Sequence, residues 1–179
     1  ATVERNSVDV APAVKTLMAA SPDAVVQIGT YQACAAFIRQ ARKAGYGGTF
    51  YNVSFVGTQA LADELGKDGA GVVVSQVMPS PYNASRAIAR EFASAVAAAN
   101  NKEVQANFSS MEGYVAARLF AEGLKRAGAN PTRESLMAGL EGIGSQSLGG
   151  FAVSLSSNDH VASSFVELSM LTGDGRVRT

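Results

Sequence analysis

The chain has 179 residues, 47% of them hydrophobic, with 15 basic and 15 acidic side chains. This length fits one ordinary domain or two small lobes, and the apolar content is enough for a buried core. The balanced charge gives no electrostatic reason to expect nucleic acid or an anionic membrane surface as a partner. The single cysteine, Cys34, excludes an intrachain disulfide and a multi-cysteine zinc site, and we expect it to be a small buried residue of a helix. No apolar run approaches the roughly 20 residues that span a bilayer, so membrane insertion is not expected.

The first part of the chain alternates helices with short apolar strands. Asp9 is a predicted N-cap, and Pro12 falls in the first turn of the helix that follows, which ends before Pro22. The nearly continuous apolar run of Asp23–Ile28 is typical of a strand covered on both faces. The next elements are predicted to be a helix over 32–44, a strand over 50–53, a helix over 58–65 and a strand over 72–77. This alternation predicts an α/β fold in which a parallel sheet carries helices on its faces.

The composition changes at Met78–Asn83, which contains two prolines and is typical of a stiff connector. Only helices are predicted behind it, over 85–99, 111–127 and about 131–142. Thr132 is a predicted N-cap of the last helix, and Ser135 is not expected to complete a capping box with it. The final part returns to alternating apolar and polar residues, which predicts strands over 151–155 and 165–171.

Two short stretches place an aromatic ring beside small polar residues where a strand is followed by a helix. Tyr31 and Gln32 follow the first predicted strand, and Ser54 and Phe55 follow the second. In open α/β sheets, ligands bind at this edge, just past the carboxyl ends of the strands. Rings with a few hydroxyl and amide groups suit a small organic molecule better than a phosphate or a metal, although each ring can also simply cap the sheet edge. Gln76, at the end of the third strand, is a weaker candidate of the same kind.

Three further candidates lie on the predicted helix over 111–127. Met111 and Tyr114 occupy an apolar face, where packing in a core is the main expectation and ligand contact is the alternative. Glu112 has mixed surroundings, and the sequence does not assign it a role.

The motifs of common catalytic and nucleotide-binding sites do not occur in the sequence. It has no glycine-rich phosphate loop and no nucleophile elbow. The single histidine, His160, lies beside Asp159 in a polar loop, and nothing marks a nucleophile that would complete a catalytic set. We therefore expect a protein that is not an enzyme and that holds no cofactor and no metal.

Five segments of the chain resemble one known family. They are Gly29–Ile38, Asn52–Gly57, Gly71–Pro79, Glu112–Arg118 and Leu148–Phe151. In this order they are similar to the type I periplasmic solute-binding proteins of branched-chain amino-acid ABC transporters, such as the Leu/Ile/Val-binding proteins. The resemblance covers essentially the whole chain, and its specificity comes from the order of the five motifs.

The resemblance implies a fold of two α/β lobes that close around a small ligand, and this chain resembles a fragment, the later half. Residues 1–80 are similar to an α/β segment of the second lobe, 81–147 to a helical segment of the first lobe, and 148–179 to the return into the second lobe. The crossings are then expected over 79–83 and 148–151. The implied function is that of an extracytoplasmic solute-binding component of an ABC transporter, which delivers a small carboxylate, amino acid or amino-acid-like ligand to a permease. The implied location is the bacterial periplasm, reached through a signal peptide that this chain does not contain.

The resemblance also bears on single residues. Tyr31 resembles the second-lobe aromatic residue that packs on the ligand, and Ser54 falls about where amino-acid-binding members place a carboxylate for the ligand's ammonium group. A serine cannot neutralise a cation, so our hypothesis is an aromatic or aliphatic carboxylate, or an amide, rather than a plain α-amino acid. The alternatives are a ligand-sensing regulatory or receptor domain of the same fold and, with less support, an α/β enzyme. A single lobe would expose an apolar face, which predicts weak ligand binding and self-association of the piece.

Overall fold

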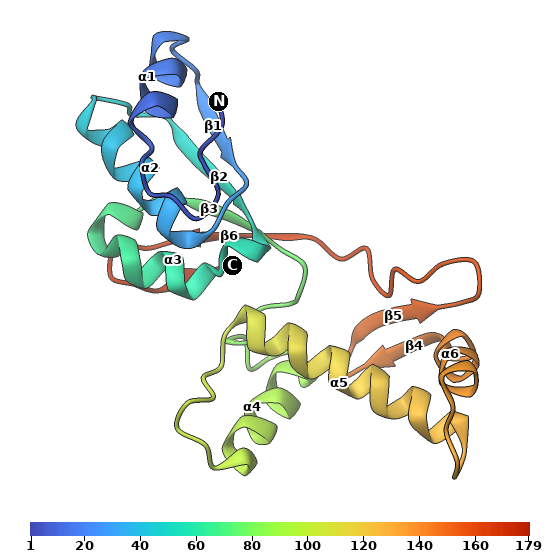
Figure 1. Ribbon diagram of the computed structural model, residues 1–179. Coiled ribbons are helices and arrows are strands. Elements are labelled where there is room, and N and C mark those ends of the chain that lie inside the picture. Colours follow the sequence, from blue (N-terminus) through green and yellow to red (C-terminus); the bar gives the residue numbers. More distant parts are fainter. The chain divides into compact units, whose positions relative to one another are not determined.

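The computed structural model describes residues 1–179. The chain divides into two compact units, which Figure 1 colours along the sequence. Unit 1 consists of residues 1–76 and 167–179, and unit 2 consists of residues 77–166. Unit 2 is therefore inserted into the sequence of unit 1. None of the helices combines the length and the apolarity needed to cross a membrane.

Unit 1 is built on a five-stranded sheet with the order β1-β2-β3-β6-β7. The strands are β1 (Ala24–Gln27), β2 (Thr49–Val53), β3 (Val73–Gln76), β6 (Glu167–Leu171) and β7 (Val177–Arg178). The first three strands are parallel to one another, whereas β6 and β7 pair antiparallel. The prediction of an α/β fold with a mainly parallel sheet is confirmed.

One face of this sheet is covered by helices (Figure 1). They are α1 (Ala11–Ala19), α2 (Tyr31–Lys43) and α3 (Thr58–Leu65). In α2, Phe37, Ile38 and Ala41 recur at helical spacing and are buried, which gives the helix an apolar stripe that packs on the strands. The ring of Phe37 meets that of Phe50 in β2 edge to face, with the centroids 6.4 Å apart.

The start of α1 differs from the prediction. The N-cap position is occupied by Val10, whose side chain cannot cap, whereas Asp9 lies one residue earlier. The backbone N–H of Asp9 donates to the hydroxyl of Ser7 at 3.0 Å. Pro12 does lie at the start of the helix, where its missing N–H costs nothing. The predicted cap at Asp9 is therefore wrong, and the proline is the residue that marks this end.

The opposite face of the sheet carries apolar side chains, most of which are exposed. Val26, Tyr51, Val73 and Met170 form one row across four strands, each the register partner of the next. Val26 is 71% exposed and Met170 is 50% exposed. The prediction that the first strand is covered on both faces is wrong, because β1 is an edge strand whose Val26 and Ile28 lie on the surface.

Unit 2 contains three helices and one antiparallel hairpin. The elements are α4 (Ala87–Ala99), α5 (Phe108–Ala127), α6 (Arg133–Glu141), β4 (Gly144–Leu148) and β5 (Phe151–Leu155). Its core is formed by apolar side chains of α4, α5 and the hairpin, among them Ile88, Phe92, Met111, Val115, Leu148 and Phe151. The sequence predicts the helices and β5, but it does not predict β4, because Gly144–Ser147 has no apolar alternation.

The helices α5 and α6 both begin with reciprocal hydrogen bonds. The backbone N–H of Ser135 donates to Thr132 Oγ1 at 3.1 Å, and the backbone N–H of Thr132 donates to Ser135 Oγ at 2.8 Å. The prediction that these two residues do not form a capping box is wrong, because the serine hydroxyl takes the place of the usual Glu or Gln side chain. Asn107 and Ser110 make the same arrangement at the start of α5.

The boundaries between the units lie at 76/77 and 166/167. The first is close to the expected crossing over 79–83, whereas the second lies later than the expected crossing over 148–151. The reason is that β5 pairs with β4 inside unit 2, and the N–H of Ser154 donates to the carbonyl of Ala162 at 2.8 Å. The chain therefore rejoins unit 1 only where β6 begins. Which lobe each unit forms in a longer protein stays a prediction.

Candidate functional site

The exits of β1 and β2 lie side by side at the carboxyl edge of the parallel strands. Gln27 at the end of β1 is the register partner of Asn52, so the residues that follow each strand leave the sheet together. β1 leads through Gly29 and Thr30 into α2, and β2 leads directly into a short 3-10 helix, Ser54–Val56. The two stretches with aromatic and small polar residues therefore meet at one edge, where open α/β sheets bind ligands.

The side chains at this edge differ in exposure. Tyr31 is the first residue of α2 and is half-buried against the core of unit 1, while Gln32 beside it is exposed. Ser54 is half-buried, and Phe55 is 62% exposed. A phenyl ring exposed to this degree offers a large apolar surface beside a hydroxyl group, which suits contact with an organic molecule.

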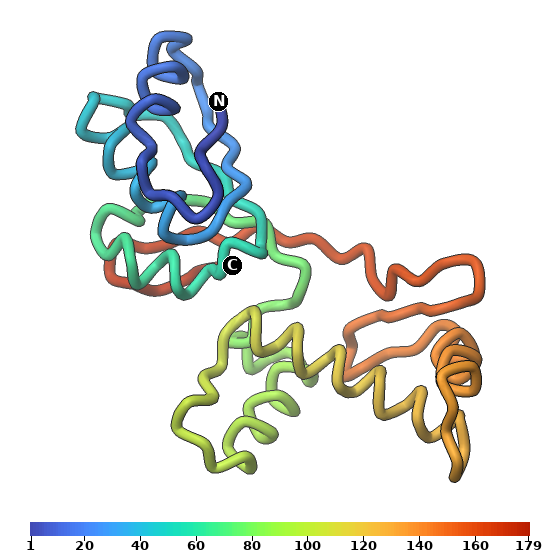
Figure 2. Tube along the Cα trace, viewed as in Figure 1, coloured from blue at the N-terminus to red at the C-terminus, as the bar shows by residue number.

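A cavity of about 630 Å³ lies in unit 1 at the exit of β1. Residues 25–30, Cys34 and Phe55 line it, together with the amino-terminal residues 1–7, the darkest blue part of the trace in Figure 2. This volume lies within the range of small-molecule sites. Phe55 is the one predicted site residue in the lining, whereas Tyr31 and Ser54 lie at the same strand exits outside it.

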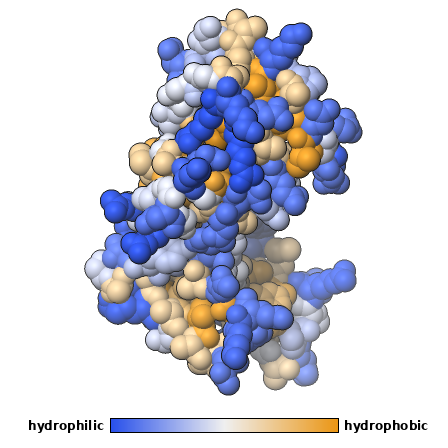
Figure 3. Space-filling model, turned by 90° about the vertical axis from the view of Figure 1, so that its left-hand side faces the viewer, coloured by the Kyte–Doolittle hydropathy of each residue, from blue (hydrophilic) through white to orange (hydrophobic).

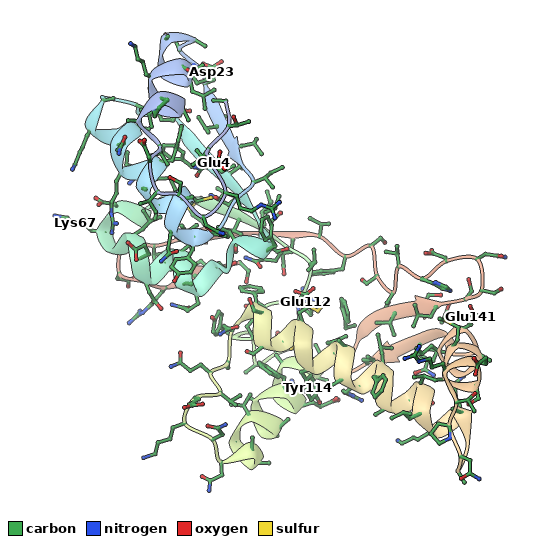
Figure 4. All side chains as sticks on the ribbon, viewed as in Figure 1. Glu4, Asp23, Lys67, Glu112, Tyr114 and Glu141 are labelled. Carbon is green, nitrogen blue, oxygen red and sulfur yellow. The ribbon has the colours of Figure 1, made fainter.

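The amino-terminal end of α2 opens at this cavity. Its N-cap Thr30 makes no side-chain cap bond, and the first turn of the helix has no acidic residue. The first backbone N–H groups of a helix have no intrahelical acceptors and carry a partial positive charge. Residues 29–33 and 53–57 contain no carboxylate, while Glu4 and Arg5 of the amino-terminal segment bring one charge of each sign to the lining (Figure 4 labels Glu4). The strand exits themselves therefore favour a hydrogen-bond acceptor or an anionic group over a cation.

Gln76 lies in the interior rather than on the surface. Its side chain is completely buried, and its amide nitrogen donates to Thr58 Oγ1 at 2.9 Å and to Ser169 Oγ at 2.7 Å. These bonds join β3 to α3 and to β6. Burial and bonding both support a packing role for Gln76, and its predicted contact with a ligand stays a prediction.

The sequence reasoning did not single out Gln27, Thr30 or Asn52. Gln27 and Thr30 line the cavity. Asn52 is 3% exposed and lies between Gln27 and Gln76 on the helix-covered face of the sheet. Gln27 and Asn52 are amides within strands, and the sequence alone carries no local signal of which face such a side chain takes.

The three candidates of unit 2 do not form one site. Met111 is completely buried in the core of unit 2, Tyr114 is half-buried, and Glu112 is exposed. Glu112 and Tyr114 project from opposite sides of α5 in Figure 4, as expected for residues two apart on a helix. The ring of Tyr114 packs on Phe92 with 5.4 Å between centroids, and Arg118 donates to its hydroxyl at 3.5 Å and pairs with Glu91. These contacts support a packing role for Met111 and Tyr114, and no contact in unit 2 supports a role for Glu112.

Comparison with known proteins identifies the family. The family described as periplasmic binding protein matches residues 1–175. A possible leucine/isoleucine/valine-binding protein from Rhodopirellula baltica SH 1 is 32% identical, with a TM-score of 0.92 over 98% of this chain and 48% of that one. A substrate-binding periplasmic protein from Ralstonia solanacearum is 33% identical, with a TM-score of 0.86 over 97% of this chain and 50% of that one. No curated protein matches the sequence.

A third solved structure shows the same fold at lower identity. It is an ABC transporter solute-binding protein from R. palustris in complex with benzoate, 21% identical, with a TM-score of 0.76 over 97% of this chain and 46% of that one. The sheet edge with its two strand exits thus belongs to the periplasmic-binding-protein fold. The chain is a member of the periplasmic binding protein family, and it spans about half the length of the solved relatives that it matches.

Proposed function

We propose that this chain is part of an extracytoplasmic solute-binding protein of an ABC transporter, and that its role is binding rather than catalysis. The observation that carries the proposal is the meeting of Tyr31, Ser54 and Phe55 at the adjacent exits of two parallel strands, in a member of the periplasmic binding protein family. Unit 1 would belong to the second lobe and unit 2 to the first, with the ligand between lobes and a permease as the transport partner. Closure of such lobes is favoured by ligand contacts that only the closed state makes.

We propose further that the ligand is a small aromatic or aliphatic carboxylate, or an amide. Residues 29–33 and 53–57 offer rings, hydroxyl groups and helix N–H groups but no carboxylate to pair with an ammonium group, and Glu4, the carboxylate in the cavity lining, is followed by the cation of Arg5. The relatives support a small organic ligand without deciding its class, because one is described as a possible leucine/isoleucine/valine-binding protein and another holds benzoate.

The test is a thermal-shift screen on the longest chain that the gene encodes, with aromatic acids, aliphatic acids and α-amino acids. A ligand present at one hundred times its Kd stabilises the folded protein by about 2.7 kcal/mol, which is a readily measured shift. We expect some of the aromatic or aliphatic acids to raise Tm, and we expect the α-amino acids to leave Tm unchanged. Tight binding of leucine or valine would overturn the ligand class, and silence across the whole panel would overturn the binding function.

Substitution of one ring gives a sharper version of this test. Tyr31→Ala should weaken binding of a hit by roughly fivefold or more in calorimetry, because a stacked ring contributes about 1 kcal/mol or more. Tyr51→Ala is the matched control, since Tyr51 is a tyrosine of unit 1 on the opposite face of the sheet. If both variants lost the same amount of binding affinity, the effect would not be local to the strand exits.

A further inference from the structure

Three amides at the carboxyl end of the sheet, the half-buried Gln27 and the buried Asn52 and Gln76, have buried polar atoms without hydrogen-bond partners. The atoms are Gln27 Oε1, Asn52 Nδ2, Asn52 Oδ1 and Gln76 Oε1. Asn52 is 3% exposed and Gln76 is completely buried. Leaving such atoms unpaired costs about as much as a lost hydrogen bond, and native proteins nearly always supply a partner. We call Gln27, Asn52 and Gln76 the buried amide row.

The strand register brings these amides onto one face. Gln27 and Asn52 are register partners on β1 and β2, and Asn52 is the partner of Val74 on β3. Gln76 lies two residues beyond Val74 and therefore points to the same side of the sheet. This is the side that α2 and α3 cover, so all three side chains lie between the strands and the helices.

The structure shows no hydrogen bond from Asn52 to either glutamine oxygen. Three of the four atoms are acceptor oxygens, and Asn52 Nδ2 is the one donor among them. Both N–H groups of the Gln76 amide are already used, toward Thr58 and Ser169. If Asn52 Nδ2 donated to both glutamine oxygens, Asn52 Oδ1 would still need a donor, and within the row only Gln27 Nε2 could supply one. Since these atoms make no such bonds, a group that brings further O–H or N–H donors would pair them.

We propose that the buried amide row holds ordered water, which donates to the surplus oxygens and accepts from Asn52 Nδ2. A buried water typically makes about three hydrogen bonds to groups that are otherwise unsatisfied, and this row offers such a set. Gln27 also lines the cavity at the exit of β1, which gives water a route to the row. The bridged row ties together β1, β2 and β3 just before the residues that leave the sheet toward Tyr31 and Ser54. That last consequence, the positioning of the candidate site, rests on the proposed function, whereas the water site does not.

The direct test is nuclear magnetic resonance of the isotope-labelled chain in water. We expect cross-relaxation between water and the side-chain amide protons of Asn52, with the sign that distinguishes a long-lived bound water from freely exchanging surface water. The amide of Asn158, which is exposed in a loop, is the internal control and should show only exchange with bulk solvent. Absence of long-lived water at Asn52 would overturn the proposal.

A substitution gives a second, independent readout. If water bridges the row, Asn52→Val removes the hydrogen-bonding groups that hold the water, and the two glutamine oxygens lose donors. Tm should then fall by roughly 3 °C or more. In a dry row, the same change removes two unpaired polar atoms and Tm should stay level or rise, which would overturn the proposal. Asn158→Val, the matched surface control, should leave Tm unchanged. Neither readout depends on a transport ligand, so failure of the proposed function and failure of the water site are distinguishable.

Discussion

At the scale of single residues, Cys34 shows how burial determines chemistry. It borders the cavity at the exit of β1, yet it is only 3% exposed, and desolvation by burial raises the pKa of its thiol to about 11. The neutral form is therefore favoured over the thiolate throughout the physiological range. The nucleophile of thiol chemistry is the thiolate, so a cysteine in this state is poorly reactive.

We expect Cys34 to react with a disulfide reagent such as DTNB at pH 8 about two orders of magnitude more slowly in the native chain than in urea. The rate in the native chain should rise steadily with pH, because the thiolate fraction grows until the pH passes the raised pKa of about 11. Stopped-flow absorbance at several pH values measures both rates. Equal rates in the native and unfolded chains at pH 8 would contradict the assignment.

Single residues also show where the sequence was informative and where it was not. The strand exits could be predicted because Gly29 and Ser54 interrupt the apolar runs at the ends of the two strands. The burial of Asn52 could not be predicted, because an amide in a strand points inward or outward according to which face the helices cover. That choice is made by packing across the whole unit and leaves no local mark in the sequence.

At the scale of elements, α5 and α6 approach closely through glycines. A Cβ built on Gly139 would lie 2.5 Å from the carbonyl oxygen of Gly123, a backbone atom that cannot move aside. A Cβ built on Gly113, earlier in α5, would meet nothing within 4 Å. The presence of both helices could be predicted from the helical spacing of apolar residues in the sequence. The contact between the two glycines could not be predicted, because it depends on how the two helices pack against each other.

We expect Gly139→Ala to lower the free energy of unfolding by roughly 1–3 kcal/mol, because the added methyl group forces α5 and α6 apart. Gly113→Ala should raise it by about 0.5–1 kcal/mol, since alanine is the better helix former at an open position. Urea denaturation followed by circular dichroism measures both variants. If Gly139→Ala left the free energy of unfolding unchanged, the contact between the two helices would be loose.

At the scale of the whole molecule, the open face of the sheet is a surface that gathers exposed apolar side chains. The left-hand side of Figure 1, seen in Figure 3, is mainly hydrophilic with small orange spots. The open sheet face instead gathers exposed apolar residues, with Val26 at 71%, Leu168 at 59% and Met170 at 50%. Parallel strands are normally covered on both faces, and a contiguous apolar patch of this kind favours association.

We therefore expect this chain to self-associate in solution, and Met170→Lys to weaken the association by placing a charge in the patch. Met137→Lys is the matched control, because Met137 is 51% exposed but lies on α6 of unit 2. Sedimentation velocity over a range of concentrations measures the distribution of species. A monodisperse monomer at all concentrations, or equal effects of the two lysines, would contradict the role of this face.

The insertion of unit 2 between β3 and β6 has a consequence for synthesis. Gln76, where the chain leaves unit 1, is the register partner of Glu167, where it returns. A ribosome therefore releases all of residues 77–166 before it makes the strands that finish the sheet of unit 1. Unit 2 can therefore fold while the edge of β3 that β6 later occupies is still unpaired. The neighbouring ends also mean that a tight turn joining β3 to β6 would replace the whole insert without altering the strand order.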